Sequence, residues 1–258
     1  MSYEAIKVER VENYVSIRLN RPEKRNAMSA TMLTEIDAAL GEVEQDKNIR
    51  AILLSGEGKD FCSGIDLGQV DRVEGDGANR VRTIEAIFQR LERLPVPTIA
   101  AVRGAALAGG LQLALHCDLR LASQTARMGM TLGRVGLMVP FDFTRKLIEI
   151  IGSPNTAMVL YSAEAFEASR ALAMGMVHQV FEDGRLEDEA RALAEKVASN
   201  APLSLRAMKA TIRRCMSNAY DAPHDDIDEM ARAVRRSQDA REGVRAFLEK
   251  RKPVWRAE

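Results

Sequence analysis

One stretch of the chain, residues 101–120, combines the residue types best suited to chemistry. Gly109 and Gly110 stand where an apolar strand pattern gives way to an apolar helix pattern, so the backbone there can approach a substrate closely. Backbone N–H groups at such a turn are the donors that stabilise a developing oxyanion. For a Gly-Gly pair alone, a tight packing turn is the favoured explanation. Gln112 follows with an amide that cannot titrate near pH 7.

Alternating strands and helices must position this turn. Ser29 is suited to cap a helix, and a second amphipathic pattern ends before Pro95 and Pro97. Apolar or alternating runs predict strands at residues 6–9, 14–20, 51–54, 98–102 and 119–122. The first two predict an antiparallel hairpin, and the others predict βαβ units with ligands near the carboxyl ends of their strands.

The strand signals fade after about Pro140, and helical patterns take their place. The pair Ser153-Pro154 predicts a helix start. Further helices are predicted at residues 166–173, 186–199, 204–216 and 239–250. We therefore predict an α/β protein with a core domain at residues 1–199 and a C-terminal helical region at residues 200–258.

Composition excludes several classes of protein. The 258 residues include 37 Lys+Arg and 37 Asp+Glu, so no basic field favours a nucleic-acid partner. No run of about 18 apolar residues predicts a membrane span, and the first ten residues are too polar for a secretory signal, so we expect a cytoplasmic protein. Cys62, Cys117 and Cys215 are too scattered for a disulfide framework or zinc site.

Two other ligand sites are rejected on spacing. The segment Gly56-Glu57-Gly58-Lys59 lacks the third glycine of a dinucleotide loop, where Phe61 stands, and the Ser or Thr of a P-loop. His116 has no partner at metal-binding spacing, so we expect a core histidine and no metal site.

Four segments in this order resemble the enoyl-CoA hydratase/isomerase family of the crotonase superfamily. They are LNRPEKRNAM at 19–28, GEGKDFCSGIDL at 56–67, residues 104–118, and AFLEKRKP at 246–253. The resemblance covers nearly the whole chain. It implies a crotonase-like spiral of ββα units followed by a helical trimerisation region, and hence a homotrimer or a dimer of trimers.

The resemblance also implies a ligand, an acyl-CoA thioester, in fatty-acid or related acyl-CoA metabolism, with no covalently bound cofactor. The oxyanion-hole donors would be the N–H groups of Ile65 and Gly109. With both glycine loops present, this explanation of Gly109 is favoured over simple packing. The residues implied for coenzyme A are Lys24, Asn26, Ala27, Ser63, Asp66, Leu67, Phe247 and Lys250. For the lysines, a solvated surface position is the alternative.

The match departs from the family pattern at its acid and base positions. Gln112 and Leu132 fall where family hydratases carry two glutamates. Because hydration needs a base and a proton donor, ordinary hydratase activity is not expected. Asp142, between two phenylalanines, is the remaining acid or base candidate, with helix capping as the alternative. The sequence thus leaves two functions: an enzyme with altered chemistry that relies on the oxyanion hole, or a non-catalytic acyl-CoA carrier or interaction subunit.

Overall fold

The structure is a computed structural model that describes residues 3–66, 77–135, 137–216, 229, 233, 236–249, 251–256 and 258. Its strands are β1 (Ile6–Val11), β2 (Tyr14–Leu19), β3 (Ala51–Gly56), β4 (Thr98–Val102), β5 (Ala105–Leu107), β6 (Leu119–Ser123), β7 (Arg127–Gly129), β8 (Ala165–Glu167) and β9 (Gln179–Phe181). Its α-helices are α1 (Ala30–Gln45), α2 (Gly77–Arg93), α3 (Gly109–Leu115), α4 (Phe141–Ser162), α5 (Ala168–Met174), α6 (Leu186–Ala198), α7 (Pro202–Met216) and α9 (Gln238–Leu248). Two 3₁₀ helices are η1 (Pro22–Lys24) and η3 (Leu132–Val135).

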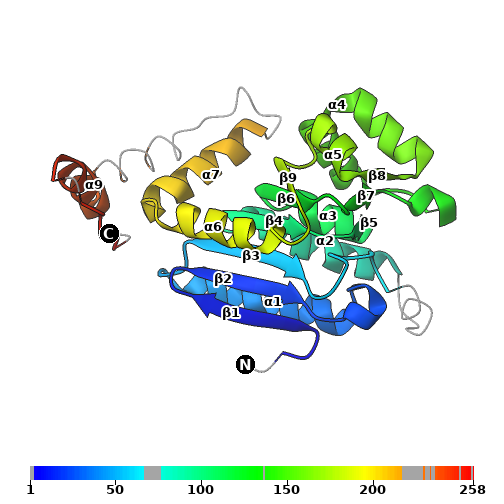
Figure 1. Cartoon of the computed structure of the whole chain (residues 1–258), viewed down its shortest axis with the longest axis horizontal. Coiled ribbons are helices and arrows are strands. Elements are labelled where there is room, and N and C mark those ends of the chain that lie inside the picture. The colour runs from blue at the N-terminus through cyan, green and yellow to red at the C-terminus, as the bar shows by residue number, and fades with distance from the viewer. Residues whose placement is uncertain are drawn as a thin grey trace.

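The strands form a six-stranded sheet in the order β1-β2-β3-β4-β6-β9 and a three-stranded sheet in the order β5-β7-β8 (Figure 1). In the larger sheet β1 and β2 are antiparallel, as the hairpin prediction requires, and the remaining neighbours are parallel. The carboxyl ends of β2, β3, β4 and β6 therefore lie along one edge.

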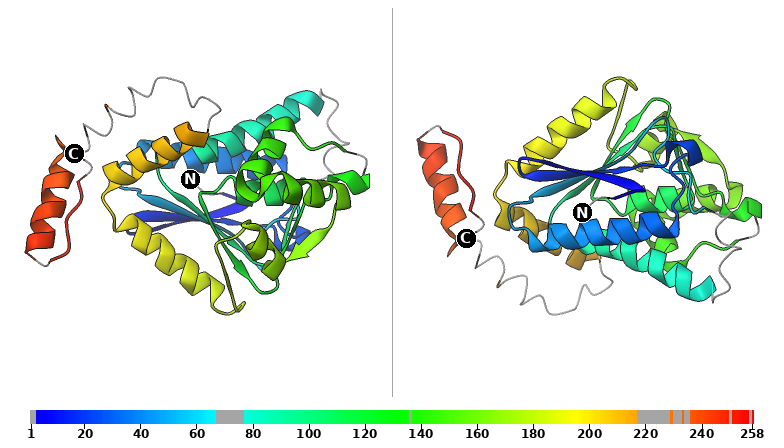
Figure 2. Two further views of the ribbon diagram at one scale, coloured as in Figure 1. Left: turned by 90° about the horizontal axis from the view of Figure 1, so that it is seen from above. Right: turned by 90° about the horizontal axis from the view of Figure 1, so that it is seen from below.

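Helices cover both faces of the larger sheet. Helices α1 and α2 lie on one face and α6 lies on the other (Figure 2). Ile52 and Leu54 belong to the apolar cluster that includes α1 and α2, whereas Ala51 and Leu53 pack with α6. Because successive side chains of a strand point to opposite faces, a sheet covered on both faces needs such a continuous apolar run.

Helix α1 begins where the sequence predicts. The Ser29 Oγ accepts a hydrogen bond from Met32 N over 3.1 Å and caps the helix. Below the cap, the buried face of α1 includes Ile36, Leu40 and Val43 at helical spacing. This stripe fixes α1 against the sheet.

A buried ion pair ties α7 to the core. Lys209 Nζ lies 2.7 Å from Asp118 Oδ2 and donates to Val96 O over 2.9 Å. The same carboxylate oxygen accepts from Thr98 N over 2.8 Å, at the start of β4. The Lys209 side chain is 7% exposed, so its charge is matched mainly within the protein. The division after residue 199 stays a prediction.

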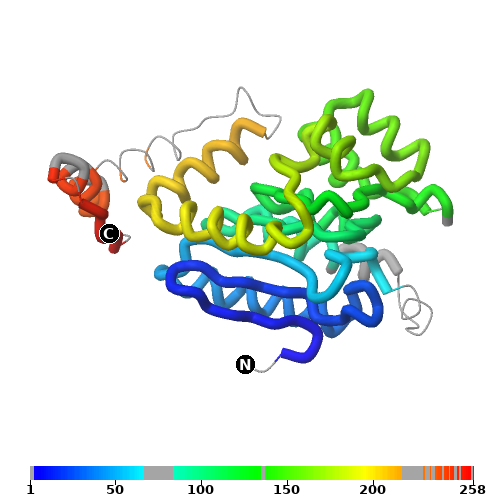
Figure 3. The backbone as a smooth tube through the Cα atoms, in the orientation of Figure 1, coloured from blue at the N-terminus to red at the C-terminus, as the bar shows by residue number. Residues whose placement is uncertain are grey.

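The C-terminal segment lies at the end of the molecule opposite α4 and α5 (Figure 3). Its hydrogen bonds to the core include those from Arg50 Nη2 to Trp255 O over 2.8 Å and from Trp255 Nε1 to Ser199 O over 2.5 Å. Within the described ranges, no helix has the length and apolar character needed to cross a membrane.

Three local predictions need correction. Residues 166–173 were predicted as one helix, but β8 occupies residues 165–167 and α5 begins at Ala168. The three-residue strands β5, β7 and β8 lie where no strand was predicted. The helix predicted to start at Ser153-Pro154 is the second half of α4, which is kinked at Gly152 (φ 72°). Because the helix is already interrupted at Gly152, the missing N–H of Pro154 is tolerated there.

Candidate functional site

Two backbone segments meet beyond the carboxyl ends of β3 and β4. Because these strands are parallel neighbours, the segments that follow them leave the sheet at the same edge. Cys62 N donates to Ala105 O over 2.8 Å, and Leu107 N donates to Cys62 O over 3.0 Å. A Cβ placed on Gly64 would lie 3.5 Å from Gly109 N. The structure thus brings together the two glycine loops that the sequence predicts to act jointly.

The N–H groups of Ile65 and Gly109 have no hydrogen-bond acceptor among the described residues. On either side of them, Asp66 N and Ala108 N each donate to a backbone carbonyl. Ala108 has a positive φ of 48°, a strained conformation for an alanine, immediately before Gly109. Since backbone N–H groups inside proteins are nearly always paired, two unpaired donors on adjacent loops are suited to hold an oxyanion.

The two glycines of the Gly-Gly pair have separate roles. A Cβ on Gly110 would lie 2.0 Å from Cys62 O, so the loops can touch there only if the residue is glycine. A Cβ on Gly109 would meet Met28 Cε at 2.9 Å, the movable end of a side chain. The packing explanation therefore holds at Gly110, and the oxyanion explanation of Gly109 stays a prediction.

Gln112 lies one turn along α3 from Gly109 and lines a small recess with a volume of about 10 Å³. The residue is 7% exposed, and its side-chain amide makes no hydrogen bond to any described residue. Leu132, in η3, is half-buried, packs against the main apolar core and does not line this recess. The lining residues are Glu85, Phe88, Gln89, Gln112, His116, Pro140, Asp142 and Phe143.

Asp142 does line the recess, but in a different setting from the one predicted. Its side chain is exposed and accepts a hydrogen bond from Gln89 Nε2 over 3.1 Å, so the expected desolvation is wrong. The capping alternative is also wrong, because Pro140 occupies the N-cap and Asp142 lies in the first turn of α4. An acidic side chain in that turn still interacts favourably with the helix dipole.

The residues implied for coenzyme A surround the first loop. Lys24 is exposed on η1, and Ala27 and Ser63 are half-buried. Asp66 accepts an ion-paired hydrogen bond from Arg21 Nη2 over 3.0 Å. Leu67 and Lys250 lie outside the described residues, as does the side chain of Phe247.

Asn26 is fully buried and supports the loop from beneath. Its Oδ1 accepts from Arg21 N over 2.9 Å. Its Nδ2 donates to Glu57 O over 2.9 Å and to Asp60 O over 2.7 Å. All of these bonds join the side chain to backbone, so Asn26 holds the loop in shape and its amide is not available to a ligand.

The sequence did not reveal a polar cluster behind Gln112. His116 is buried as predicted, and its Nδ1 lies 2.8 Å from Gln112 O. Its Nε2 lies 4.0 Å from Glu92 Oε2, and Lys146 Nζ donates to Glu92 Oε1 over 3.0 Å. Burial lowers the pKa of His116 below its usual 6.5, although Gln112 O and Glu92 oppose the shift. No spacing signal joins these three residues, because they come from α2, α4 and the end of α3.

The two buried thiols, Cys62 and Cys117, are poor nucleophiles at neutral pH. Burial raises the pKa of Cys62 to about 12, and burial likewise raises the pKa of Cys117 to about 12. In the described part of the chain, no group of three or more His, Cys, Asp or Glu side chains is arranged to hold a metal ion.

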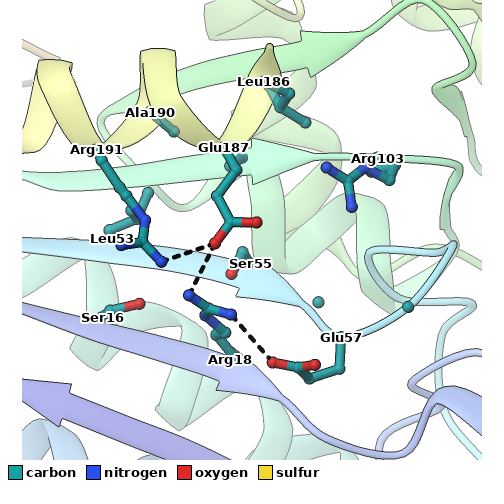
Figure 4. A pocket seen from close by; sticks show the side chains of 13 residues that line it. Ser16, Arg18, Leu53, Ser55, Glu57, Arg103, Leu186, Glu187, Ala190 and Arg191 are labelled. Atoms are coloured by element: carbon teal, nitrogen blue, oxygen red, sulfur yellow. Dashed lines mark hydrogen bonds and ion pairs between the residues drawn. The ribbon is translucent and has the colours of Figure 1, made fainter. Parts of the chain in front are cut away.

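A second pocket lies on the opposite face of the larger sheet, beneath α6 (Figure 4). Arg18 bonds to Glu57 and Glu187, and Glu187 also bonds to Arg191 (Figure 4). Small side chains of the sheet and α6 leave this space open, and the sheet separates it from Gln112. None of the predicted site residues lines this pocket.

Comparisons with known proteins agree with this geometry. The model of the enoyl-CoA hydratase/isomerase family matches residues 9–258. A short-chain-enoyl-CoA hydratase from Clostridium acetobutylicum is 33% identical over 238 residues, which are 92% of this chain and 91% of the relative. A 1,2-epoxyphenylacetyl-CoA isomerase from Escherichia coli is 34% identical over 247 residues, which are 93% of this chain and 94% of the relative.

Among solved structures, an enoyl-CoA hydratase/carnithine racemase from Magnetospirillum magneticum superimposes with a TM-score of 0.94 at 28% identity. The superposition covers 100% of this chain and 97% of the other. The predicted crotonase-like α/β fold is therefore confirmed. The chain belongs to the enoyl-CoA hydratase/isomerase family of the crotonase superfamily.

Proposed function

We propose that the protein binds an acyl-CoA thioester with its carbonyl oxygen between the N–H groups of Ile65 and Gly109. The observation that carries this proposal is that both donors lack an acceptor among the described residues while Asp66 N and Ala108 N beside them are paired. Negative charge that develops on the thioester oxygen would be stabilised by about 3 to 4 kcal/mol for each such donor. Membership of a family that acts on CoA thioesters supports the same ligand.

The reaction we propose is an altered one that relies on the oxyanion hole. Gln112 lies beside the recess, where its amide can donate or accept a hydrogen bond but cannot move a proton. Leu132 contributes only apolar contact. Asp142 forms part of the recess wall, and its exposure and its bond to Gln89 favour that role over proton transfer. Isomerisation or decarboxylation of a thioester fits this set of groups better than hydration does.

Coenzyme A would run along the first loop. The backbone of Ser63, Ile65 and Asp66 would line the channel, Lys24 would approach the diphosphate, and Ala27 would contact the pantetheine. In this arrangement Asn26 acts indirectly, by holding the loop through its three backbone hydrogen bonds. Leu67, Phe247 and Lys250 complete the proposed set from the sequence alone.

A second candidate function is a non-catalytic acyl-CoA carrier. The observation that favours it is the neutral Gln112 beside the recess, together with Leu132 packed against the core. A carrier needs the oxyanion donors and the acyl recess but no group that moves a proton. The two candidates therefore share a binding site and differ in turnover.

Calorimetry and turnover assays separate the candidates. An acyl-CoA should bind more tightly than the free fatty acid, because the nucleotide adds contacts that the fatty acid lacks. Equal affinity for the two ligands would contradict the proposal. Conversion of a 3-enoyl-CoA to a 2-enoyl-CoA, or CO₂ release from a 2-carboxyacyl-CoA, would support the enzyme, and tight binding with no turnover of either would support the carrier.

Hydration of crotonyl-CoA tests the proposed acid and base positions. Native hydration should be very slow, because each positioned acid or base typically contributes about 10² to 10⁴-fold. The double variant Gln112→Glu/Leu132→Glu should gain hydratase activity, and either single variant should gain much less. Efficient native hydration would show that Gln112 and Leu132 do not occupy the glutamate positions.

We further propose that the protein assembles as a homotrimer or a dimer of trimers. Met208, Ile212 and Met216 are 59%, 65% and 44% exposed along one stripe of α7. Side chains four residues apart on a helix share a face, and an exposed apolar stripe typically marks an interface. Light scattering should find an oligomer, and Ile212→Asp should weaken it. A native monomer at micromolar concentration would refute this proposal.

A further inference from the structure

We propose that the pocket beneath α6 binds a small oxoanion, such as inorganic phosphate, through the guanidinium of Arg103 and the hydroxyl of Ser55. Both residues line this pocket. The larger sheet separates it from Gln112, so the proposal does not depend on the thioester binding proposed above. The ligand is held by hydrogen bonds and charge, and no covalent step is involved.

The alternation of side chains along three neighbouring strands builds the pocket wall. Alternate residues of β2, β3 and the end of β4 line it: Ser16 and Arg18, Leu53 and Ser55, and Ala101 and Arg103. Residues two apart on a strand point to the same face, here the face that α6 covers. Arg18 and Ser55 are paired in the strand register, and Arg103 comes directly after β4. The polar groups thus gather at the carboxyl ends of the strands.

The guanidinium of Arg103 has donors to spare. Its Nη2 donates to the backbone carbonyl of Asp183 over 3.2 Å, and it makes no ion pair with a described carboxylate. The Asp183 carboxylate accepts instead from Thr125 Oγ1 over 2.6 Å. Arg103 Nε is buried without an acceptor, and Nη1 also has none among the described residues but is open to solvent. Figure 4 shows the guanidinium directed into the pocket.

Two hydroxyl groups on the pocket wall also lack partners. Ser16 is 5% exposed and Ser55 is half-buried, and neither side chain makes a hydrogen bond to a described residue. Ser55 follows Leu54, which pairs with Ala100 across β3 and β4. Ser55 is therefore two residues behind Arg103 on the neighbouring strand, and standard strand spacings place their Cα atoms about 8 Å apart. An arginine side chain and a bound oxoanion together can bridge that distance.

The charges around the pocket favour an anion. Arg18 reaches Glu57 over 3.3 Å and Glu187 over 2.8 Å, and Arg191 also reaches Glu187 over 2.8 Å. Both carboxylates are thus already paired, and Arg103 is the additional cation. The lining residues carry three arginines and two glutamates, which gives a net charge of +1. A small anion is attracted to such an excess of positive charge.

The size of the cavity selects the class of anion. Its volume is about 80 Å³. One water needs about 10 to 15 Å³ of such space, so the cavity holds about five water-sized groups. Inorganic phosphate has five non-hydrogen atoms, whereas a nucleotide is several times larger. A guanidinium also matches the spacing of phosphate or carboxylate oxygens, which a halide ion does not offer.

Titration with inorganic phosphate at constant ionic strength, followed by ³¹P NMR, tests the site. The phosphate signal should broaden with the native protein, and Arg103→Gln should weaken binding by about 10-fold or more, because a hydrogen bond to a charged group is lost. Ser55→Ala should weaken it about threefold. The Ser55 hydroxyl has no partner in the described residues, so this variant should fold normally even if Arg103→Gln does not. Arg127→Gln is the matched control, because Arg127 pairs with Glu167 in the smaller sheet.

Glu187→Gln separates direct binding from structural damage. It removes a negative charge and frees Arg18 and Arg191, so phosphate should bind more tightly, whereas a damaged pocket would bind more weakly. Phosphate affinity should be unchanged when an acyl-CoA saturates the protein, and competition would overturn a separate site by showing that the phosphates of coenzyme A reach it. No phosphate binding, equal binding in Arg103→Gln, or equal broadening suppressed by chloride at matched ionic strength would also overturn the proposal. Phosphate binding without acyl-CoA binding would refute only the proposed function.

Discussion

Replacement of Gly110 by alanine should disable the thioester site, whereas the same change at Gly109 should be much milder. A Cβ on Gly110 would lie 2.0 Å from Cys62 O and 2.8 Å from Cys62 C, both backbone atoms. An optimal contact between such atoms needs about 3.5 Å, so one loop must move by about 1.5 Å. At Gly109 the nearest atom is Met28 Cε at 2.9 Å, which rotation of the methionine side chain can clear. Both variants keep the N–H at residue 109.

The magnitude follows from overpacking and misplacement. Forcing atoms into a packed site typically costs about 1 to 3 kcal/mol of stability. Displacement of a catalytic group by about 1 Å costs about 100-fold in rate. Gly110→Ala moves Cys62 and with it Ile65, three residues further along the same loop. We therefore expect Gly110→Ala to lose about 1 to 3 kcal/mol and about 100-fold in thioester turnover.

Chemical denaturation and calorimetric titration with an acyl-CoA check both variants, with circular dichroism as a control for folding. Gly109→Ala should retain most of its stability and affinity. Similar effects of the two substitutions would refute the reasoning, because they would show that the contact between Gly110 and Cys62 does not position the loop.

Three further outcomes are expected. Lys209→Ala should lose about 1 to 3 kcal/mol in urea denaturation, because Asp118, whose side chain is 31% exposed, loses its cation but keeps its hydrogen bond from Thr98 N. A loss below about 0.5 kcal/mol would contradict this. The pKa of His116 is lower in the folded protein than in the unfolded chain, so protonation favours unfolding. The contribution of the neutral ring to the free energy of unfolding is complete above about pH 6.5 and is lost as the pH falls, with a limiting slope of about 1.4 kcal/mol per pH unit. His116→Gln should make that decline shallower, and an unchanged slope in denaturation between pH 7.5 and 5 would argue against it. Iodoacetamide should label exposed Cys215 in the native protein and spare Cys62 and Cys117, as peptide mass mapping can test.

The positions of β3 and β4 were accessible from sequence because each contains a continuous apolar run that the fold covers on both faces. The run at residues 98–102 predicted β4 to its end residues. Ser29 revealed the start of α1 because a helix cap is a local signal. Strands β5, β7 and β8 have three residues each, too few for a period to show. Asp142 was wrongly considered as the N-cap of α4, because Pro140, two residues earlier, occupies that position.

The two site loops were foreseen from their glycines, but their support was not. Asn26 was expected to meet a ligand, and only the folded chain shows its amide turned toward Arg21 and the loop backbone. His116 and Glu92 are 24 residues apart on separate helices, so their approach depends on how α2 packs against α3. Contacts of this kind are set by tertiary packing, and no local pattern encodes them.

The ion pair between Lys209 and Asp118 fixes the position of α7 relative to the start of β4 and to the chain that follows α3. Lys209 reaches inward to Asp118 and Val96, while Met208, Ile212 and Met216 on the same helix face outward. Asp118 comes two residues after His116. If α7 slid by one turn along its axis, the ion pair between Lys209 and Asp118 would break. The exposed stripe of Met208, Ile212 and Met216 therefore cannot shift relative to the helix that carries Gly109. The same ion pair therefore fixes the position of the outward-facing stripe of α7 relative to the proposed thioester site.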